Sequence, residues 1–351
     1  MRVLLFLCLT LSISAAIQAQ TTVTDESLNW PGTAKGSTHE LAMTDEYVYV
    51  TGQNMHAVAK VSYDGKILHY PMPDSSGPHG IIFDKYGRLW VSLEFHNQVV
   101  QLDKKGKIIQ TIDVNMNIPG SRPIGTAPHG LGLDADGETI WFTGKRTSTV
   151  GKINPDGTIE HFELKTLGAV PIYLHAGPDG NMWGTELVGN NILKVTPSGK
   201  VSEYAIPTNN SRPIAIKPGP NGIYMWFTEE AGHRIGRVDM QGNIVEFQVR
   251  NFNGNEILAG LAFDQYGNLW TQSYVDQNNP TPAGTDYIVK IDKAILTTDD
   301  TDLSDIQVDY YAVPTTKTVM HRIKEGKDGN IYFTELKQDK LGKVVVSSNK
   351  K

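Results

Sequence analysis

Cysteine is nearly absent from this chain of 351 residues, which holds a single one, Cys8, near its start. The residues around it have the pattern of a cleaved secretory signal: a positive Arg2, an apolar run over residues 3–11, and small or polar residues up to Ala19. Removal of residues 1–19 leaves no cysteine, and therefore no disulfide, no thiolate metal ligand and no thiol nucleophile. We predict a signal peptide over residues 1–19 and a secreted or periplasmic protein that packing alone stabilises.

Long apolar runs and an excess of positive charge are also lacking. No stretch after residue 19 approaches the 18 apolar residues of a membrane-spanning helix, so we predict no membrane span. The formal net charge is −6, and it becomes −7 once the signal, with one arginine and no acid, is removed. Such a surface does not attract nucleic acid or an anionic membrane, and we expect neither as a partner. The motifs Gly-x-Ser-x-Gly and His-Glu-x-x-His and a phosphate-binding loop are absent too.

What the chain has instead is an internal repeat. Seven degenerate copies can be stacked, each with one turn before an aromatic residue and a second turn after it. Pairs such as Asp64-Gly65 and Asp156-Gly157 supply the positive φ angles of tight hairpins. Between the turns, apolar residues alternate with a period of two, which indicates strands. The tryptophans at 90, 141, 183, 226 and 270 take equivalent positions, and we interpret them as packing between repeats.

Seven such copies predict an all-β fold, a single seven-bladed β-propeller of four-stranded blades over residues 20–351. The last copy lacks a fourth strand, and residues 26–31 resemble the fourth strands of other copies. We therefore expect the N-terminal strand to complete the last blade and close the ring, which removes an exposed sheet edge. Two insertions, about 113–126 and 275–308, are either surface loops or a rim over a binding face.

One position of the repeat, just before the apolar run of the innermost strand, is rich in histidine. We call it the histidine slot, and in chain order it holds His39, His79, His129, Ile172, Ile214, Ala259 and His321. Because the ring closes, the blades that carry the four histidines are consecutive. We therefore expect these histidines to line one side of the mouth of the central channel, opposite an apolar side.

Carboxylates are expected at the same face, because the first strand of a blade begins where its antiparallel second strand ends. The residues concerned follow the aromatic by three or four positions: Glu94, Glu186, Glu229, Glu230 and Glu335. Thr-Glu recurs at three of them and suggests a structural cap, whereas Glu94 is displaced by one residue and shares a blade with His79. Histidines beside a glutamate can bind a divalent cation, or a histidine can act as a general base.

The stacked motif reads Pro-His-Gly, Leu-Trp-Phe-Thr-Glu, Asn-x-Ile-Gly-x-Ile/Val and Gly-x-Ile-x-Glu-Phe/Tyr. One copy has Met-Trp-Phe-Thr-Glu at 225–229, Arg-Ile-Gly-Arg-Val at 234–238 and Gly-Asn-Ile-Val-Glu-Phe at 242–247. Over residues 38–346 this pattern resembles the virginiamycin B (streptogramin B) lyase family. The resemblance implies a propeller that opens a cyclic depsipeptide at its ester by elimination, with magnesium, using two histidines, two glutamates and a tyrosine.

The resemblance also implies a site, although two of its positions differ here. The motif match makes candidate catalytic residues of His79 and His39 and a candidate metal ligand of Glu94. The histidine slot adds His129 as a candidate catalytic residue and His321 as a candidate metal ligand. Gly77 stands at the position of the family's first glutamate. His129 stands at the position of the tyrosine in the family's Pro-Tyr-Gly motif. The loss of one carboxylate and the gain of imidazoles favour zinc, manganese or iron over magnesium as the divalent metal.

Three functions remain open on the sequence. The leading one is a metal-assisted lyase on an ester- or uronate-like substrate, in which a cation near Glu94 acidifies a C–H group and His79 takes the proton. A lactonase-type hydrolase also uses a propeller with a metal at the channel mouth, though its ligands are mostly oxygens. A propeller that only binds a ligand or partner is the third. We expect a small-molecule, oligosaccharide or peptide substrate and a monomer.

Overall fold

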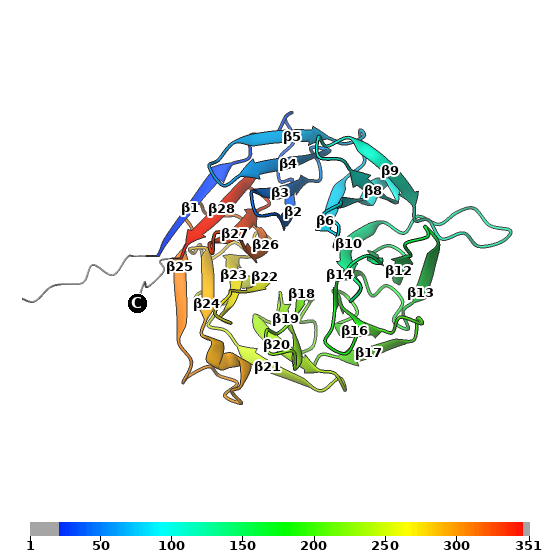
Figure 1. Ribbon diagram of the computed structural model, residues 1–351. Coiled ribbons are helices and arrows are strands. Elements are labelled where there is room, and N and C mark those ends of the chain that lie inside the picture. Colours follow the sequence, from blue (N-terminus) through cyan, green and yellow to red (C-terminus); the bar gives the residue numbers. More distant parts are fainter. Residues whose placement is uncertain (1–20, 347–351) are drawn as a thin grey trace, which may run out of the picture.

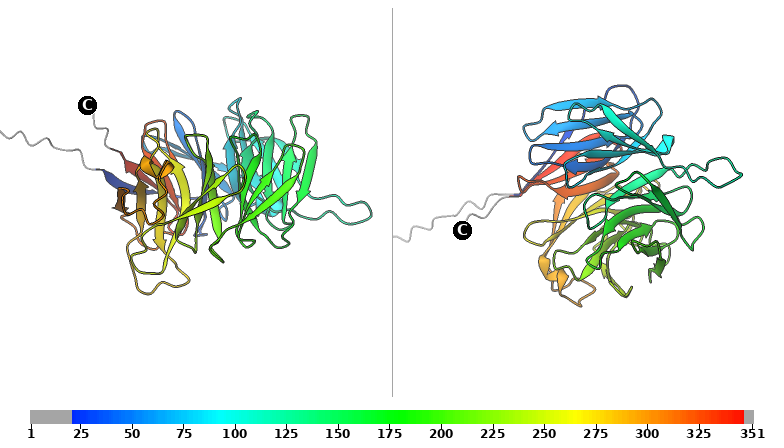
Figure 2. Two further views of the ribbon diagram at one scale, coloured as in Figure 1. Left: turned by 90° about the horizontal axis from the view of Figure 1, so that it is seen from below. Right: turned by 45° about the vertical axis from the view of Figure 1, so that its right-hand side comes forward.

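The computed structural model describes residues 21–346, which form a ring of seven four-stranded antiparallel sheets (Figure 1). Each sheet is one blade, with its first strand at the centre of the ring and its last at the rim. Seen from the edge, the ring is a flattened disc (Figure 2). The predicted seven-bladed propeller is confirmed, while the predicted signal peptide, residues 1–19, lies outside the described residues.

The first four blades follow one another along the chain. Blade 1 consists of β2 (Thr38–Met43), β3 (Tyr47–Gly52), β4 (Ala57–Ser62) and β5 (Ile67–Pro71). Blade 2 consists of β6 (Pro78–Phe83), β7 (Leu89–Leu93), β8 (Gln98–Leu102) and β9 (Ile108–Asp113), with the short helix η1 (Glu94–His96) after β7. Blade 3 consists of β10 (Pro128–Leu133), β11 (Ile140–Gly144), β12 (Thr149–Ile153) and β13 (Ile159–Glu163). Blade 4 consists of β14 (Pro171–Ala176), β15 (Met182–Glu186), β16 (Asn191–Val195) and β17 (Val201–Ala205).

The remaining three blades complete the ring. Blade 5 consists of β18 (Pro213–Pro218), β19 (Tyr224–Glu229), β20 (Arg234–Asp239) and β21 (Ile244–Gln248). Blade 6 consists of β22 (Glu256–Phe263), β23 (Leu269–Val275), β24 (Tyr287–Ile291) and β25 (Val308–Ala312), with η2 (Lys293–Leu296) between the last two strands. Blade 7 consists of β26 (Met320–Glu325), β27 (Ile331–Glu335), β28 (Lys340–Val345) and β1 (Thr22–Ser27). Within the described part of the chain, no helix is long and apolar enough to cross a membrane.

Blade 7 confirms the predicted closure of the ring. Strand β1 pairs antiparallel with β28, from Thr22 opposite Val345 to Ser27 opposite Lys340. Figure 1 shows the two strands side by side, although they come from opposite ends of the chain. The backbone groups along β28 are thereby paired, and β1 becomes the rim strand of the blade, as β5 and β9 are in theirs.

The repeated residues act in turns and between blades. Gly65 and Gly157 have φ angles of +87° and +86°, which side-chain-bearing residues rarely adopt. The aspartate of the turn also accepts a hydrogen bond from the indole of the repeat tryptophan, as Asp264 does from Trp270 at 2.9 Å. The tryptophans pack against the next blade; Trp141, for example, shares a core cluster with Leu174. The predicted role of the tryptophans in packing is confirmed.

The first insertion is a surface loop, one of the two expected forms, whereas the second is divided. Residues 113–126 lie between β9 and β10, and Figures 1 and 2 show this loop extending outward from the ring, away from its centre. The second insertion is not a single loop, because β24 runs through it. The segment 276–286 follows the second strand of blade 6 and lies at the face of the histidine slot. The segment 292–307 follows the third strand and lies at the opposite face, so one rim over a binding face is wrong for 275–308.

Candidate functional site

Each innermost strand has a β-bulge at the histidine slot. In all seven blades the register between the first and second strands shifts at this point, for example between Pro78 and Ile81 in β6 and between Pro128 and Leu131 in β10. A bulge inserts an extra residue and re-aims the side chains next to it. The bulge, repeated around the ring, turns the slot residues toward the channel mouth.

A buried hydroxyl on the second strand holds each of the histidine bulges in place. In blade 2, Ser92 Oγ accepts a hydrogen bond from the Gly80 N–H at 2.7 Å and donates one to the His129 carbonyl of the next blade at 3.0 Å. Thr51 and Thr334 donate in the same way to the carbonyls of His79 and His39, both at 2.8 Å. The threonine of the recurring Thr-Glu is therefore the residue that ties the slot of one blade to the next.

The glycine of the Pro-His-Gly motif is required by close packing between blades. A Cβ atom on Gly80 would lie 2.5 Å from the His129 carbonyl oxygen, and one on Gly130 would overlap the Ile172 carbonyl in the same way. The motif thus combines a histidine for the channel with a glycine that lets the next blade approach.

The four histidines meet, as the sequence predicts. The centroid of the His79 ring lies 3.6 Å from that of His129, 4.8 Å from that of His39 and 5.8 Å from that of His321. The centroids of the His39 and His321 rings are 5.1 Å apart. The other three slot positions are buried and apolar: Ile172, Ile214 and Ala259. The predicted division of the mouth into a histidine side and an apolar side is confirmed.

Burial keeps the imidazoles of His79, His129 and His39 neutral. His79 and His129 are 1% and 4% exposed, and burial, followed by neighbouring positive groups, lowers the pKa of both well below its usual value. The side chain of His39 is partly exposed, yet burial, followed by the neighbouring His321, lowers its pKa to about 3. Near neutral pH these side chains carry lone pairs that can accept a proton or bind a cation.

Glu94 reaches the histidines but is already partnered. One oxygen of Glu94 and one nitrogen each of His79 and His129 lie within 4.8 Å of one another. The carboxylate also accepts hydrogen bonds from Gln53 at 2.7 Å and Lys145 at 3.0 Å. Burial raises the pKa of Glu94, and the Lys145 ammonium offsets part of this effect. The predicted proximity to His79 is confirmed, with Lys145 as a neighbour that the sequence did not reveal.

Glu40 is the site residue that sequence reasoning missed. It follows His39, at a position where other blades have Gly80 or Gly130, and its buried carboxylate pairs with Arg322 of the adjacent blade 7. Its Oε1 atom lies 3.4 Å from His321 Nε2 and 3.9 Å from His79 Nδ1. Burial alone would raise the pKa of Glu40, but Arg322 and His321 outweigh it and hold the pKa below its usual value. The signal in the sequence that could have revealed Glu40 is a charged residue at a position where other blades have a glycine.

Comparisons with known proteins agree with this geometry. Residues 115–279 match the virginiamycin B lyase family. Over 111 residues the chain is 35% identical to virginiamycin B lyase of Nocardia farcinica, a match that covers 32% of this chain and 34% of that protein. The matched stretch thus spans about a third of the length of this curated relative.

Solved structures extend the likeness to the whole ring. Virginiamycin B lyase from Staphylococcus aureus has a TM-score of 0.75 at 25% identity, over 93% of this chain and 100% of that one. Its catalytically inactive histidine-to-alanine variant with quinupristin has a TM-score of 0.74 at 23% identity, with the same coverage. The chain is a seven-bladed propeller that resembles the virginiamycin B lyases in sequence over part of its length and in fold over nearly all of it.

At Gly77 the chain lacks room for the first glutamate that the family resemblance implies. Gly77 has a φ of +61°, and a Cβ atom there would lie 2.5 Å from the ring of Phe95. A glutamate at this position would therefore be strained and would displace Phe95. A buried carboxylate stands on the neighbouring blade instead, that of Glu40 on β2.

The donor atoms around Glu40 fit a divalent cation. Glu40 Oε1 and His321 Nε2 are both buried, and neither has a hydrogen-bond partner among the described residues. Their separation of 3.4 Å is close to the roughly 3.3 Å between neighbouring ligands of a tetrahedral zinc ion with bonds of about 2.0 Å. One atom each of Glu40, His79 and His321 also lie within 4.8 Å of one another. Two imidazoles and one carboxylate suit zinc, manganese or iron better than magnesium.

Proposed function

We propose that this propeller is a metal-assisted lyase, which breaks a C–O bond by elimination in an ester- or uronate-like substrate. The observation that carries the proposal is the pair of buried ligand atoms, Glu40 Oε1 and His321 Nε2, which face each other, beside the neutral His79. The likeness to virginiamycin B lyases supports this reaction class, and so does the inactivity of a histidine-to-alanine variant of one such enzyme.

Glu40, His79 and His321 would hold the divalent cation. The alternative set, His79, Glu94 and His129, is less ready, because Glu94 would first have to release Lys145. A bound cation supplies polarisation of a substrate carbonyl, which acidifies the neighbouring C–H group. Glu94 and Lys145 then remain as a polar pair that can position the substrate at the same mouth.

His39 is the better placed proton acceptor. Its Nδ1 lies 2.7 Å from the Ser37 carbonyl and donates its hydrogen there, which leaves the lone pair on Nε2. His39 is also partly exposed, whereas His79, the base expected from the sequence, is 1% exposed and lies among the ligands. His129 packs against His79 at 3.6 Å and would fix the orientation of its ring.

The bond changes balance without water or an oxidant. His39 takes the proton from the carbon next to the carbonyl, and the electron pair of that C–H bond forms a C=C bond. The C–O bond at the adjacent carbon breaks, and its electrons leave with the oxygen, as a carboxylate from an ester or as an alcohol after protonation from a uronate. The product is unsaturated and conjugated with the carbonyl.

Two measurements test the proposal. Thermal unfolding of protein freed of metal, titrated with Mg²⁺, Mn²⁺ or Zn²⁺, should show a higher midpoint for the wild type with at least one ion, since the ion binds only the folded state. His321→Ala should lose this shift, and His161→Ala, on the rim strand β13, should keep it. A panel of depsipeptide esters and polyuronates is then followed by ultraviolet absorbance, where His39→Ala should abolish formation of the unsaturated product.

Different results would contradict different parts of the proposal. If no divalent cation stabilises the wild type, the metal site is wrong. If a substrate is cleaved without an ultraviolet-absorbing product, the reaction is hydrolysis, as in a lactonase. If ligands bind and none is cleaved at any metal concentration, the propeller is a binding protein.

A further inference from the structure

A second set of polar residues lies deeper in the channel. Three residues beyond the histidine slot, roughly 10 Å along each strand, three blades carry basic side chains: His175 on β14, Lys217 on β18 and Lys324 on β26. The other four blades have small or apolar residues at this position: Ala42, Ile82, Gly132 and Ala262. The basic residues are therefore a departure from the repeat on three blades only.

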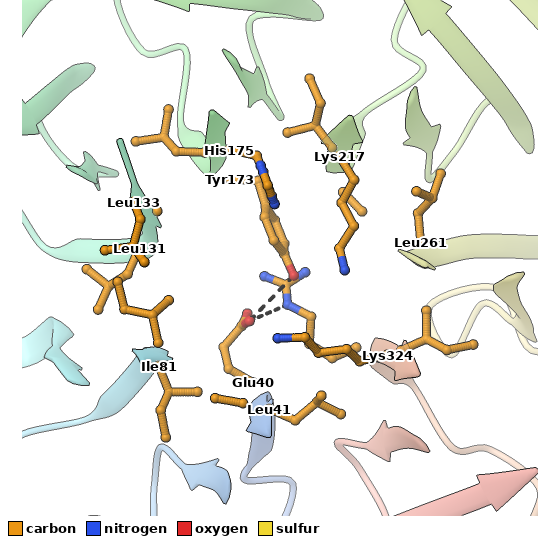
Figure 3. Close-up of a pocket in the computed structure, with 18 of the residues that line it drawn as sticks. Glu40, Leu41, Ile81, Leu131, Leu133, Tyr173, His175, Lys217, Leu261 and Lys324 are labelled. Atoms are coloured by element: carbon orange, nitrogen blue, oxygen red, sulfur yellow. Dashed lines mark hydrogen bonds and ion pairs between the residues drawn. The ribbon is translucent and has the colours of Figure 1, made fainter. Parts of the chain in front are cut away.

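These residues line a cavity of about 350 Å³ inside the ring, and Figure 3 shows Lys217 and Lys324 extending toward its middle. The only carboxylate in its lining is Glu40, whose Oε2 atom is taken by Arg322. Within residues 21–346, neither Lys217 nor Lys324 has an ion-pair partner. The cavity thus holds more positive than negative groups.

The buried side chain of Arg322 is a second indication of a ligand, independent of the lysines. Its side chain is 6% exposed, and its guanidinium lies 3.1 Å from the centre of the Tyr173 ring. Its Nε donates to Glu40, but Nη1 and Nη2 are buried and have no hydrogen-bond partner in the described chain. Unsatisfied buried donors of this kind are rare, because leaving them unpaired is costly.

The surroundings of Lys217 and Lys324 disfavour the charged form of both side chains. Burial, and then Lys324, lowers the pKa of Lys217 to about 7, while burial lowers the pKa of Lys324. Burial also lowers the pKa of His175, to about 4. Lys217 and Lys324 are partly buried in the cavity, and a positive charge held there without a counter-charge is unfavourable unless an anion joins it.

We propose that Lys217, Lys324 and Arg322 form a binding site for a small oxyanion, a carboxylate or a phosphate-like group, which we call the basic channel site. Lys217 and Lys324 would neutralise the charge of the oxyanion, and the free Nη atoms of Arg322 would donate to its oxygens, a geometry that suits planar and tetrahedral oxyanions. The site is separate from the metal ligands at the mouth, although Glu40 and Arg322 connect the two. It does not depend on the proposed lyase reaction.

Calorimetric titration with inorganic phosphate, sulfate and acetate tests the site. The wild type is compared with Lys217→Met, Lys324→Met and the control Lys200→Met, which removes an exposed lysine, all at constant ionic strength set with chloride. We expect the wild type and the control to bind one equivalent of an oxyanion and each channel variant to bind at least tenfold more weakly. His321→Ala should bind the anion as the wild type does, which separates this site from the metal site.

Thermal unfolding of the same variants shows whether weaker binding is caused by misfolding. Without anion, Lys217→Met and Lys324→Met should unfold at the same temperature as the wild type or higher, because each removes a buried charge. Tighter binding of phosphate than of acetate would assign a phosphate-like ligand, and the reverse a carboxylate. No binding to the wild type, or equal binding to wild type and folded channel variants, would overturn the proposal.

Discussion

Glu40 is the residue at which the two polar parts of the channel meet. Its Oε1 atom faces His321 and His79, while its Oε2 atom pairs with Arg322, which borders the basic channel site. Glu40 and Arg322 are both more than nine-tenths buried, so each charge depends on the other. A buried pair of this kind contributes little beyond an apolar pair, but breaking it leaves an uncompensated charge.

Removal of one partner of this pair should therefore be costly. In Glu40→Gln we expect the free energy of unfolding to fall by about 3 kcal/mol, because the Arg322 charge stays buried without a counter-charge. Urea unfolding measures the change. The double variant Glu40→Gln, Arg322→Met should recover most of the loss, and a double variant as unstable as the single one would contradict the coupling.

The buried carboxyl of Glu229 should make the stability of the protein depend on pH. Burial, with the nearby Glu246, raises its pKa to about 9, so it is protonated when folded and ionised above about pH 4.5 when unfolded. The folded state then holds one proton more, and stability falls as pH rises from about 4.5 to about 9.

Glu229→Gln should remove this contribution. Between pH 6 and 8 we expect the variant to gain on the wild type by about 1.4 kcal/mol per pH unit in the free energy of unfolding. Denaturant unfolding at several pH values measures the difference. Glu163→Gln, which changes an exposed carboxyl, is the control, and a wild-type slope in Glu229→Gln would show that the buried carboxyl is ionised.

At the scale of the element, the innermost strand is positioned by its neighbour rather than by its own sequence. The bulge at the histidine slot leaves backbone groups that the ladder does not pair, and the hydroxyl of Ser92 or its threonine equivalents pairs them. The geometry of the histidines thus depends on a buried hydroxyl of the neighbouring strand.

Ser92→Ala tests this dependence. We expect a loss of about 1–3 kcal/mol in the free energy of unfolding, since the Gly80 N–H and the His129 carbonyl lose a buried partner. Urea unfolding is the measurement, and Ser198→Ala, at an exposed turn, is the control. Equal stability of the two variants would mean that water or another group replaces the hydroxyl.

For the whole molecule, the joining of β1 to β28 makes a closed ring out of a linear repeat. Closure brings together Glu40 and Arg322, which are 282 residues apart in the chain. It also covers β28, whose unpaired edge would invite association with another chain.

A chain that starts at residue 29, without β1 and the buried Leu28, tests this closure. We expect a lower midpoint of thermal unfolding and self-association on size exclusion, because the β28 edge is open. A peptide of residues 21–30 should restore the midpoint by adding the missing strand. A monomeric truncated chain with an unchanged midpoint would contradict this role of β1.

The sequence alone determined the propeller, its seven blades, the closing strand and the histidine slot. These follow from local signals, since period-two strands and Asp-Gly turns act over a few residues, and equivalent repeat positions must take equivalent places in the ring. The meeting of His39, His79, His129 and His321 could be predicted for that reason.

Only the tertiary structure decided the partners of these residues. Lys145 pairs with Glu94 and Arg322 pairs with Glu40, in each case from an adjacent blade, and the two lysines of the basic channel site lie on strands of two different blades, β18 and β26. No spacing along the chain encodes which side chains of different blades meet in the channel. The split of the 275–308 insertion was hidden for a related reason, because β24 is a short strand between two irregular loops. Long-range packing, rather than local pattern, set the chemistry of the channel.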